Sequence, residues 1–562
     1  MDKTNVVFTV TANCHDCYRC VRVCPVKAIS VRGGQASIKD DLCIKCGTCV
    51  RECPQHAKMI RGSLEQVKQL LDSPLRVAAS VAPSFAALFE GWRATRLPSA
   101  LRMLGFDYVS ETAEGAELVT ERVFDPAAGG SITTACPAVV NYIEKYCPEF
   151  VDQLTPIASP MIAHGRMLKK RLGDGWAVVF IGPCAAKKAE AARPENAGVI
   201  DAVLTFAELS QWLEDERIDL AACPESGFQN QGNLSLSRLF PLPGGMLKTA
   251  GHDAGGANRK LIQVIGAEEV KTLFDMPLRD WDFDMAECLF CSQGCLNGPG
   301  MPGNMADVNY YHKKKELMDY TETAPPGLTP VDQSLTCAAA FKSAPVTPIK
   351  EEAVDEAGIQ RVLEETGKGD PEQQMNCGAC GYKSCRDNAI AVLKGMAEPE
   401  MCMPYMRRLA QQRTDKIIES SPNGVVILDA NLHIIKTNPA FLKMFMAGPD
   451  AIGRRISCYM DADGFEKLAS GAVEEMERIR SKYGMRYHEQ LYAMREDRQY
   501  VGMFTDISNV TFGENQLDLI KIQTLDQAQE LLDHQIKFSQ EMAHFLGRST
   551  AKSEELVKKM VD

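Results

Sequence analysis

A cysteine spacing that occurs twice near the start of the chain constrains its fold more than any other feature. The two runs are Cys14-x2-Cys17-x2-Cys20-x3-Cys24-Pro25 and Cys43-x2-Cys46-x2-Cys49-x3-Cys53-Pro54. A [4Fe-4S] cube needs four thiolates, and three cysteines of one run plus the last cysteine of the other satisfy that geometry. Zinc sites also contain Cys-x2-Cys pairs, but a zinc site does not require eight cysteines with a proline after each fourth one. The spacing therefore predicts two cubes.

In this spacing, residues 1–62 resemble the two-cluster ferredoxins of bacteria. One predicted cube takes Cys14, Cys17, Cys20 and Cys53, and the other takes Cys43, Cys46, Cys49 and Cys24. A module of this kind relays electrons and makes no chemical bonds itself.

Composition and charge narrow the class of protein. The chain has 562 residues, too many for one hydrophobic core, and its 21 cysteines suit metal ligation in a reducing compartment better than disulfides. A net charge of −12 argues against nucleic-acid and anionic membrane partners. No apolar run approaches the ~20 residues of a membrane helix, and no secretory signal is visible. We expect a cytoplasmic protein.

Three later stretches carry cysteines, and none of them alone predicts a binding site. They are TTACPAVVNYIEKYCPE (133–149), FIGPCAAKKAE (180–190) and ECLFCSQGCLNGPGMP (287–302). Together, in this order, they resemble the signature loops of [FeFe]-hydrogenases, whose patterns are TSCCPxW, MPCxxKxxE and ExMACxxGCxxGGGxP. LGFDYVSETAEGAEL (104–118) and VAPSF (81–85) are also similar to family segments. The resemblance implies a two-lobed α/β hydrogenase domain.

The resemblance implies an H-cluster and its ligands. Cys136, Cys184 and Cys291 would hold a [4Fe-4S] cube, and Cys295 would bridge this cube to a two-iron subsite carrying CO, cyanide and an azadithiolate. Such a site splits H2 into protons and electrons.

Two further matches concern the cyanide ligands of that subsite. Lys187 matches the family's lysine that pairs with a cyanide. Such a pairing is expected because a buried ammonium needs an anionic partner. A surface lysine is the alternative, since Lys188 stands beside it. A second family segment, which contacts a cyanide, matches Ala82, Pro83 and Ser84.

Ala135 departs from the family pattern in a way that affects function. Hydrogen-evolving members have the first Cys of a Cys-Cys pair there, and its thiol passes protons between the subsite amine and an acidic relay. Alanine neither donates nor accepts a proton. The resemblance therefore implies slow turnover, which suits detection better than fuel metabolism. Further departures, with neutral drift as the alternative, are Gly182, Leu289, Met161 and Pro299.

The C-terminal part carries two further resemblances. Cys377-x2-Cys380-x4-Cys385-x16-Cys402 resembles a small single-cube domain and implies one more [4Fe-4S] cluster, with zinc as the alternative. SPNGVVILDANLHIIKTNPAF and RQYVGMFTDISNVT resemble the start and end of a PAS domain, a sensor and dimer module. The pattern over 421–445 predicts strand, turn, strand and helix.

The last 50 residues have a partial heptad pattern. Leu525, Leu532 and Leu546 are spaced by multiples of seven. A signalling or dimerisation helix and a helix packed on the PAS domain both fit this pattern.

These patterns together predict a multidomain α/β plus α+β chain. Its predicted parts are a two-[4Fe-4S] ferredoxin domain (1–62), a hydrogenase domain (63–321), a linker (322–355), a single [4Fe-4S] domain (356–408), a PAS domain (409–512) and a C-terminal helix (513–562). Within the hydrogenase domain, the apolar runs 176–181 and 199–204 are the predicted strands.

Three functions remain open from the sequence. The first is a sensory [FeFe]-hydrogenase, which the order of modules and Ala135 resemble. The second is a metabolic hydrogenase with ferredoxin as electron partner, and the third is an iron–sulfur scaffold without the two-iron subsite. The implied partners are H2, protons, a redox partner such as ferredoxin, maturation proteins, a separate signalling effector and a second copy in a homodimer.

Five cysteines have no assigned role: Cys147, Cys223, Cys288, Cys337 and Cys458. Cys288 lies in the third signature stretch, where it could replace the missing proton thiol or simply pack in a core.

Overall fold

The chain was analysed as a computed structural model. It describes residues 5–123, 129–230, 234, 236–251, 260–303, 309–322, 348–349, 354–495 and 497–508. The predicted C-terminal helix, Cys337 and most of the predicted linker lie outside these ranges. The chain divides into two units, Met1–Met406 and Arg407–Asp562, and each unit is described by itself.

The cysteine-rich start of the first unit contains two short antiparallel pairs of strands. Strand β1 (Val7–Thr9) pairs antiparallel with β4 (Lys58–Ile60), and β2 (Ile29–Arg32) pairs antiparallel with β3 (Gln35–Ile38). Each cysteine run contains one short helix, α1 (Arg19–Val23) or α2 (Thr48–Arg51), which carries the third cysteine of the run. The repeated spacing thus produces a repeated local structure.

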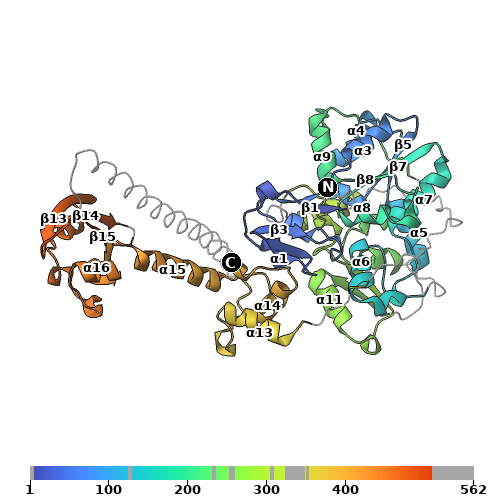
Figure 1. Cartoon of the computed structure of the whole chain (residues 1–562). Coiled ribbons are helices and arrows are strands. Elements are labelled where there is room, and N and C mark those ends of the chain that lie inside the picture. Colours follow the sequence, from blue (N-terminus) through green and yellow to red (C-terminus); the bar gives the residue numbers. More distant parts are fainter. Residues whose placement is uncertain are drawn as a thin grey trace. The chain divides into compact units, whose positions relative to one another are not determined.

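A four-stranded parallel sheet forms the first core of the central region (Figure 1). Its order is β6-β5-β7-β8, with bounds Tyr108–Glu111, Arg76–Val81, Trp176–Gly182 and Ala202–Thr205. Every residue of β7 except Trp176 is buried, as expected for a parallel strand covered on both faces. The helices that contact these strands are α3 (Leu64–Leu71), α4 (Trp92–Met103), α7 (Pro160–Leu172), α8 (Ala186–Ala191) and α9 (Phe206–Asp215).

A second core surrounds a smaller parallel pair, β9 (Leu261–Ile265) and β10 (Met285–Leu289). It includes residues of α6 (Pro137–Tyr146) and α11 (Ala267–Asp275). The remaining helices of this region are α5 (Ala113–Val123), α10 (Gly245–Gly251) and α12 (Tyr310–Glu322). The signature stretches lie at the ends of elements from both cores.

Of the two predicted strands, 176–181 agrees with β7, whereas 199–204 was placed too early. The observed strand begins at Ala202. Just before it, the Asp201 carboxylate accepts the backbone N–H of Val178 and the ammonium of Lys169. Val199 still belongs to a turn, in which its backbone N–H donates to the Asn196 carbonyl, and the apolar pattern gives no sign of this turn.

The last part of the first unit consists of short helices around the third cysteine motif. Helix α13 (Glu356–Glu365) packs against α14 (Cys385–Leu393), and α15 (Met403–Ser420) begins directly after Cys402. The predicted domain boundary at residues 408 and 409 falls inside α15. Two turns of 3-10 helix, Pro371–Gln373 and Pro399–Met401, connect these elements.

The second unit contains a five-stranded antiparallel sheet of order β12-β11-β15-β14-β13. The strand bounds are Ile434–Thr437, Gly424–Leu428, Gln499–Asp506, Met485–Met494 and Glu475–Lys482, and the helices are α16 (Pro439–Met444) and α17 (Asp463–Ala469). The strand–turn–strand–helix order predicted over 421–445 is confirmed. Phe441, Phe445 and Phe504 pack against one another in the core in tilted and edge-to-face arrangements, with ring centroids 4.7 to 5.5 Å apart.

Within the part of the chain that the structure describes, no helix has the length and apolar character needed to cross a membrane.

Candidate functional site: cysteine groups of the first unit

The cysteines of the two N-terminal runs are interleaved in space. Burial raises the pKa of the Cys20 thiol to about 11, and its thiol neighbours, which act in the same direction, are Cys17, Cys14 and Cys53. Burial likewise raises the pKa of Cys49 well above its usual value, with Cys46, Cys24 and Cys43 as thiol neighbours. We call these two sets the first and the second group. Their membership matches the two predicted ligand sets.

Backbone N–H groups point at several of these sulfur atoms. The Sγ atom of Cys24 accepts from Ala28 over 3.3 Å, that of Cys53 from Ala57 over 3.2 Å, and that of Cys43 from Lys45 over 3.3 Å. Such donors stabilise a sulfur that carries negative charge. A buried thiol with a raised pKa stays protonated by itself, whereas a bound metal deprotonates it outright. The donor set therefore fits iron–sulfur clusters.

Four cysteines from the signature stretches form a central group: Cys136, Cys184, Cys291 and Cys295. Cys136 directly precedes α6, Cys184 follows β7, Cys291 follows β10, and Cys295 opens a 3-10 turn. The pKa of Cys291 is raised well above its usual value by burial and then by the other three thiols of the group. The structure thus brings together all four predicted ligands.

The second and central groups are neighbours. Cys46 and Cys136 interact electrostatically. Gly47 has φ +73°, and a Cβ atom there would lie 2.5 Å from two atoms of the Pro299 ring. Arg51 donates to the side-chain carbonyl of Asn297 across the same interface. Pro299, a departure from the family pattern, therefore fits against a glycine of the cysteine run.

Lys187 is buried beside Ala135. Its Nζ atom donates to the Ala135 carbonyl over 3.3 Å and to Glu190 Oε2 over 2.7 Å, and the residue is 8% exposed. The surface-lysine alternative is therefore wrong. The carboxylate of Glu190 already supplies an anionic partner, so burial of the ammonium does not by itself require a cyanide.

The segment Ala82, Pro83 and Ser84 is buried at the end of β5. The Ser84 hydroxyl is inaccessible to solvent and has no hydrogen-bond partner among the described residues. A buried polar group without a partner is unfavourable, so such a group indicates a missing ligand. This donor fits the cyanide contact that the family resemblance implies.

The three other departures lie at buried or crowded positions. A Cβ atom at Gly182 would lie 2.6 Å from the Phe180 ring, so a side chain at this position would displace that ring. Met161 is 1% exposed in the core around the large sheet. Leu289 is 5% exposed on β10 and pairs with Ile265.

The third motif forms a C-terminal group: Cys377, Cys380, Cys385 and Cys402. All four line one pocket, together with Lys368 and Tyr382. No group of three or more His, Cys, Asp or Glu side chains in the described ranges could hold a single metal ion. In a cube each thiolate binds a different iron, so the four sulfurs need not converge on one point.

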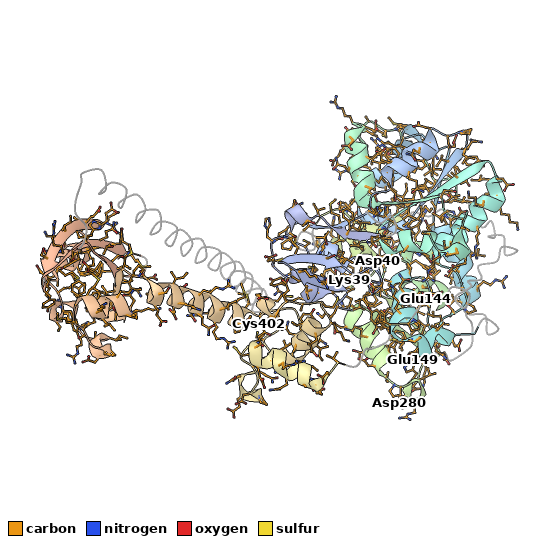
Figure 2. The ribbon with its side chains drawn as sticks, in the orientation of Figure 1. Lys39, Asp40, Glu144, Glu149, Asp280 and Cys402 are labelled. Carbon is orange, nitrogen blue, oxygen red and sulfur yellow. The ribbon has the colours of Figure 1, made fainter. Side chains whose placement is uncertain are left out.

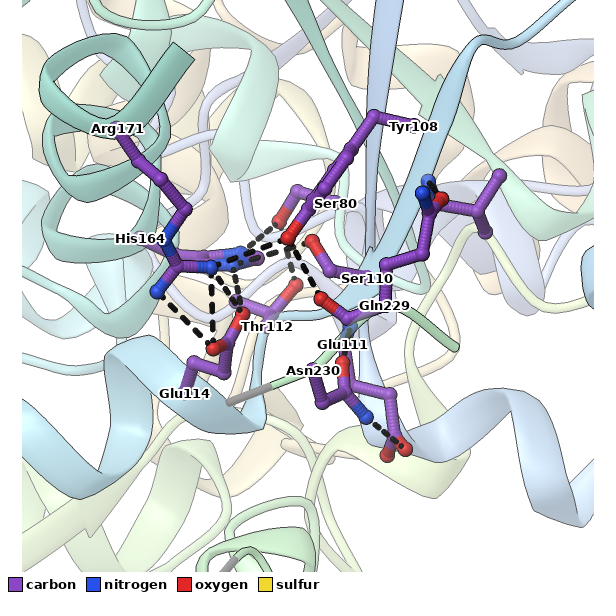
Figure 3. A network of polar contacts seen from close by, with 11 residues as sticks. Ser80, Tyr108, Ser110, Glu111, Thr112, Glu114, His164, Arg171, Gln229 and Asn230 are labelled. Atoms are coloured by element: carbon purple, nitrogen blue, oxygen red, sulfur yellow. Dashed lines mark hydrogen bonds and ion pairs between the residues drawn. The ribbon is translucent and has the colours of Figure 1, made fainter. Parts of the chain in front are cut away.

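A buried polar network that the sequence did not predict lies beside the large sheet (Figure 3). The His164 ring is hydrogen-bonded at Nδ1 to Ser80 over 2.8 Å and at Nε2 to Glu114 over 3.1 Å, and Arg171 pairs with Glu114 at 3.2 Å. His164, Ser80 and Glu114 are 0% exposed. These residues come from β5, α5 and α7, so the network joins both helices to the sheet.

The unassigned cysteines divide into buried and exposed residues. Cys147, Cys223 and Cys288 are buried, and Cys458 is exposed. Cys288 lies on β10 in the second core, and burial raises the pKa of its thiol, as does the neighbouring Cys136. Its position fits core packing.

Three family models match the chain in the first unit and one in the second. Residues 75–299 match the iron only hydrogenase large subunit, C-terminal domain, and residues 7–63 match a 4Fe-4S dicluster domain. Residues 373–404 match a putative Fe-S cluster family, and residues 412–475 match a PAS domain.

Curated relatives are similar over part of the chain. The "NADP-reducing hydrogenase subunit HndD" of Solidesulfovibrio fructosivorans is 27% identical over 41% of this chain and 49% of its own length. "Iron hydrogenase 1" of Clostridium pasteurianum is 27% identical over 42% and 52%. The match thus spans about half the length of these relatives. The "Cytosolic Fe-S cluster assembly factor NAR1" of Vanderwaltozyma polyspora is 33% identical over 20% and 22%.

The matched regions therefore have a clear order along the chain. The chain combines a 4Fe-4S dicluster domain, a region similar to the C-terminal domain of the iron only hydrogenase large subunit, and a PAS domain.

Proposed function

We propose that this protein is a sensory [FeFe]-hydrogenase. It splits H2 reversibly and slowly at an H-cluster, and it passes the resulting redox state through [4Fe-4S] clusters toward the PAS domain. The observation that carries this proposal is Ala135, which stands next to Cys136 in an otherwise complete central group.

The proposed ligands of the two-iron subsite and its cube are the four central cysteines, with Cys295 as the bridge. When bound, that subsite supplies a metal Lewis acid and an amine base for splitting H2. Lys187 contributes a buried positive charge near Cys184 and Cys295. Ser84 contributes a hydroxyl donor, and Ala135 contributes no proton carrier.

The remaining parts have roles that follow from this activity. The first, second and C-terminal groups each hold one [4Fe-4S] cluster, within domains 1–62 and 356–408. Electrons leave to ferredoxin or another redox partner. The PAS domain, residues 409–512, signals to a separate effector protein. The protein acts as a homodimer that forms through residues 513–562. Dedicated maturation proteins insert the two-iron subsite, and the protein acts in the cytoplasm.

The deciding experiment compares wild-type protein with Ala135→Cys after maturation. H2 oxidation and evolution rates are measured beside infrared spectra of both samples. CO and cyanide bands, slow wild-type turnover and a gain of tenfold or more in the variant are the expected results. Fast wild-type turnover would instead favour a metabolic hydrogenase with another proton path.

A second candidate is a non-enzymatic iron–sulfur protein. It is favoured by the similarity to a protein named as a cytosolic Fe-S cluster assembly factor. In that case the CO and cyanide bands are absent after competent maturation, while the [4Fe-4S] clusters are present.

A further inference from the structure

Lys368 contacts the last cysteine of the C-terminal group. Its Nζ atom donates to the Sγ atom of Cys402 over 2.6 Å, and the residue is 7% exposed. The lysine precedes the cysteine by 34 residues, so no local motif joins them. Cys402 lies where the small helices meet the start of α15 (Figure 2).

Among the residues that the structure describes, the other cysteine groups show no lysine ammonium bonded to a sulfur atom. In the first and second groups, the sulfur atoms accept backbone N–H groups instead. Lys58 donates to the Ala36 carbonyl, and Lys145 donates to the Cys43 carbonyl. Across the described ranges, Lys368 is the one lysine whose ammonium donates to a cysteine sulfur.

The loop of the C-terminal group is fitted against the segment that contains Cys24. The Arg22 guanidinium donates to the Ala379 carbonyl over 2.7 Å, and the Lys27 ammonium donates to the Gly381 carbonyl over 2.8 Å. Gly381 has φ +98°, and a Cβ atom there would lie 2.9 Å from Val21. The C-terminal group therefore has a defined place beside the second group.

Tyr382 lies between these two groups. It is 6% exposed, and its pKa is raised by burial and by two cysteines, Cys380 of the C-terminal group and Cys24 of the second group. Cys46 of the second group in turn neighbours Cys136. The groups therefore follow one another in the order central, second, C-terminal.

We propose that Lys368 raises the reduction potential of the cluster at the C-terminal group and makes this site the terminal electron acceptor of the first unit. This inference rests on the proposed function for the presence of the clusters. A reduced cluster carries one more negative charge than an oxidised one, so a buried ammonium on its ligand stabilises the reduced form. One electron leaves the second group, which is oxidised, and reduces the C-terminal group, with no bond formed or broken.

The test is a potentiometric titration of the full chain with dithionite, followed by electron paramagnetic resonance. Cys377→Ser identifies the signal of the C-terminal group, which is expected to be the wild-type signal reduced at the highest potential. In Lys368→Met the equilibrium constant for reduction of this cluster is expected to fall at least tenfold, which is a shift of 59 mV or more to lower potential. The signals of the other clusters are expected to remain in place.

The matched control is Lys394→Met, which removes an exposed lysine from the end of α14 in the same domain. This variant is expected to leave every potential unchanged, and Lys368→Arg is expected to restore the wild-type potential because it keeps the charge. If Lys368→Met loses the cluster, Lys368→Gln is titrated instead. An unshifted C-terminal signal in the neutral variant, or a highest-potential signal that persists in Cys377→Ser, would overturn the proposal.

This titration needs neither H2 nor the two-iron subsite. Absence of CO and cyanide bands would therefore reject the proposed hydrogenase activity while leaving the role of Lys368 intact, and an unshifted potential would do the reverse.

Discussion

The ammonium of Lys187 donates to the backbone carbonyl of Ala135 and, on its other side, to the carboxylate of Glu190. The loop that carries the alanine is thus held through its main chain. A different side chain at position 135 leaves this contact in place, which makes Ala135→Cys a local change.

Replacement of Lys187 by Met is expected to remove most of the CO and cyanide infrared intensity after maturation. The variant loses the buried positive charge near Cys184 and Cys295, whereas the first and second cysteine groups are untouched. Glu190→Gln is the control, because it breaks the same ion pair but keeps the ammonium. If both variants lose the bands equally, the lysine acts only through its ion pair.

Ser84→Ala and Ser80→Ala form a second matched pair. The Ser84 hydroxyl has no partner among the described residues. In unmatured protein, which lacks the two-iron subsite, Ser84→Ala is therefore expected to leave the free energy of unfolding unchanged or to raise it by about 1 kcal/mol. Ser80 bonds His164, so its loss is expected to cost about 1–3 kcal/mol. In matured protein, only Ser84→Ala is expected to shift a cyanide band. Thermal unfolding and infrared spectra check both.

Gly47→Ala is expected to weaken the contact between the cysteine run and the third signature stretch. The new Cβ atom would collide with Pro299, and the positive φ adds about 1–2 kcal/mol of strain. Gly33→Ala has the same strain, with φ +55°, but no atom lies within 4 Å of its Cβ. The difference in melting temperature between the two variants measures the collision, and Pro299→Gly is expected to rescue Gly47→Ala but not Gly33→Ala.

Burial raises the pKa of the Glu287 carboxyl from 4.5 to about 7. The folded state holds this proton more tightly than the unfolded state, so stability falls as pH rises from 4.5 through 7 and is level above. Glu287→Gln removes the titrating carboxyl and with it this decrease in unfolding free energy. Relative to wild type, the variant is expected to gain about 1 kcal/mol of unfolding free energy between pH 6 and pH 8. An equal pH dependence in both proteins would contradict a buried carboxyl that titrates there.

The features that could be predicted from the sequence depend on short spacings between residues. The two N-terminal runs predict their own grouping because ligands three residues apart belong to one turn of chain. Strand β7 was predictable because a buried parallel strand is continuously apolar. The start of β8 was not predictable, because the apolar run begins inside a turn in which Val199 bonds Asn196.

Contacts between distant segments could not be read from the sequence. His164, Ser80 and Glu114 carry no common spacing, and they meet only because α5 and α7 cover the same sheet. Lys368 looks like any other lysine until the fold brings it to Cys402. Polar residues in such contacts have no periodic signature, and only the packed structure shows their partners.

The interleaving of the two N-terminal runs makes the ferredoxin-like domain indivisible. Cys24 lies with the first three cysteines of the second run, and Cys53 lies with the first three cysteines of the first run. Each run supplies three cysteines to one group and a single cysteine to the other. If the two groups hold the proposed clusters, a fragment that contains one run has no complete ligand set, and loss of Cys24 or Cys53 removes a ligand from the cluster built mainly on the other run.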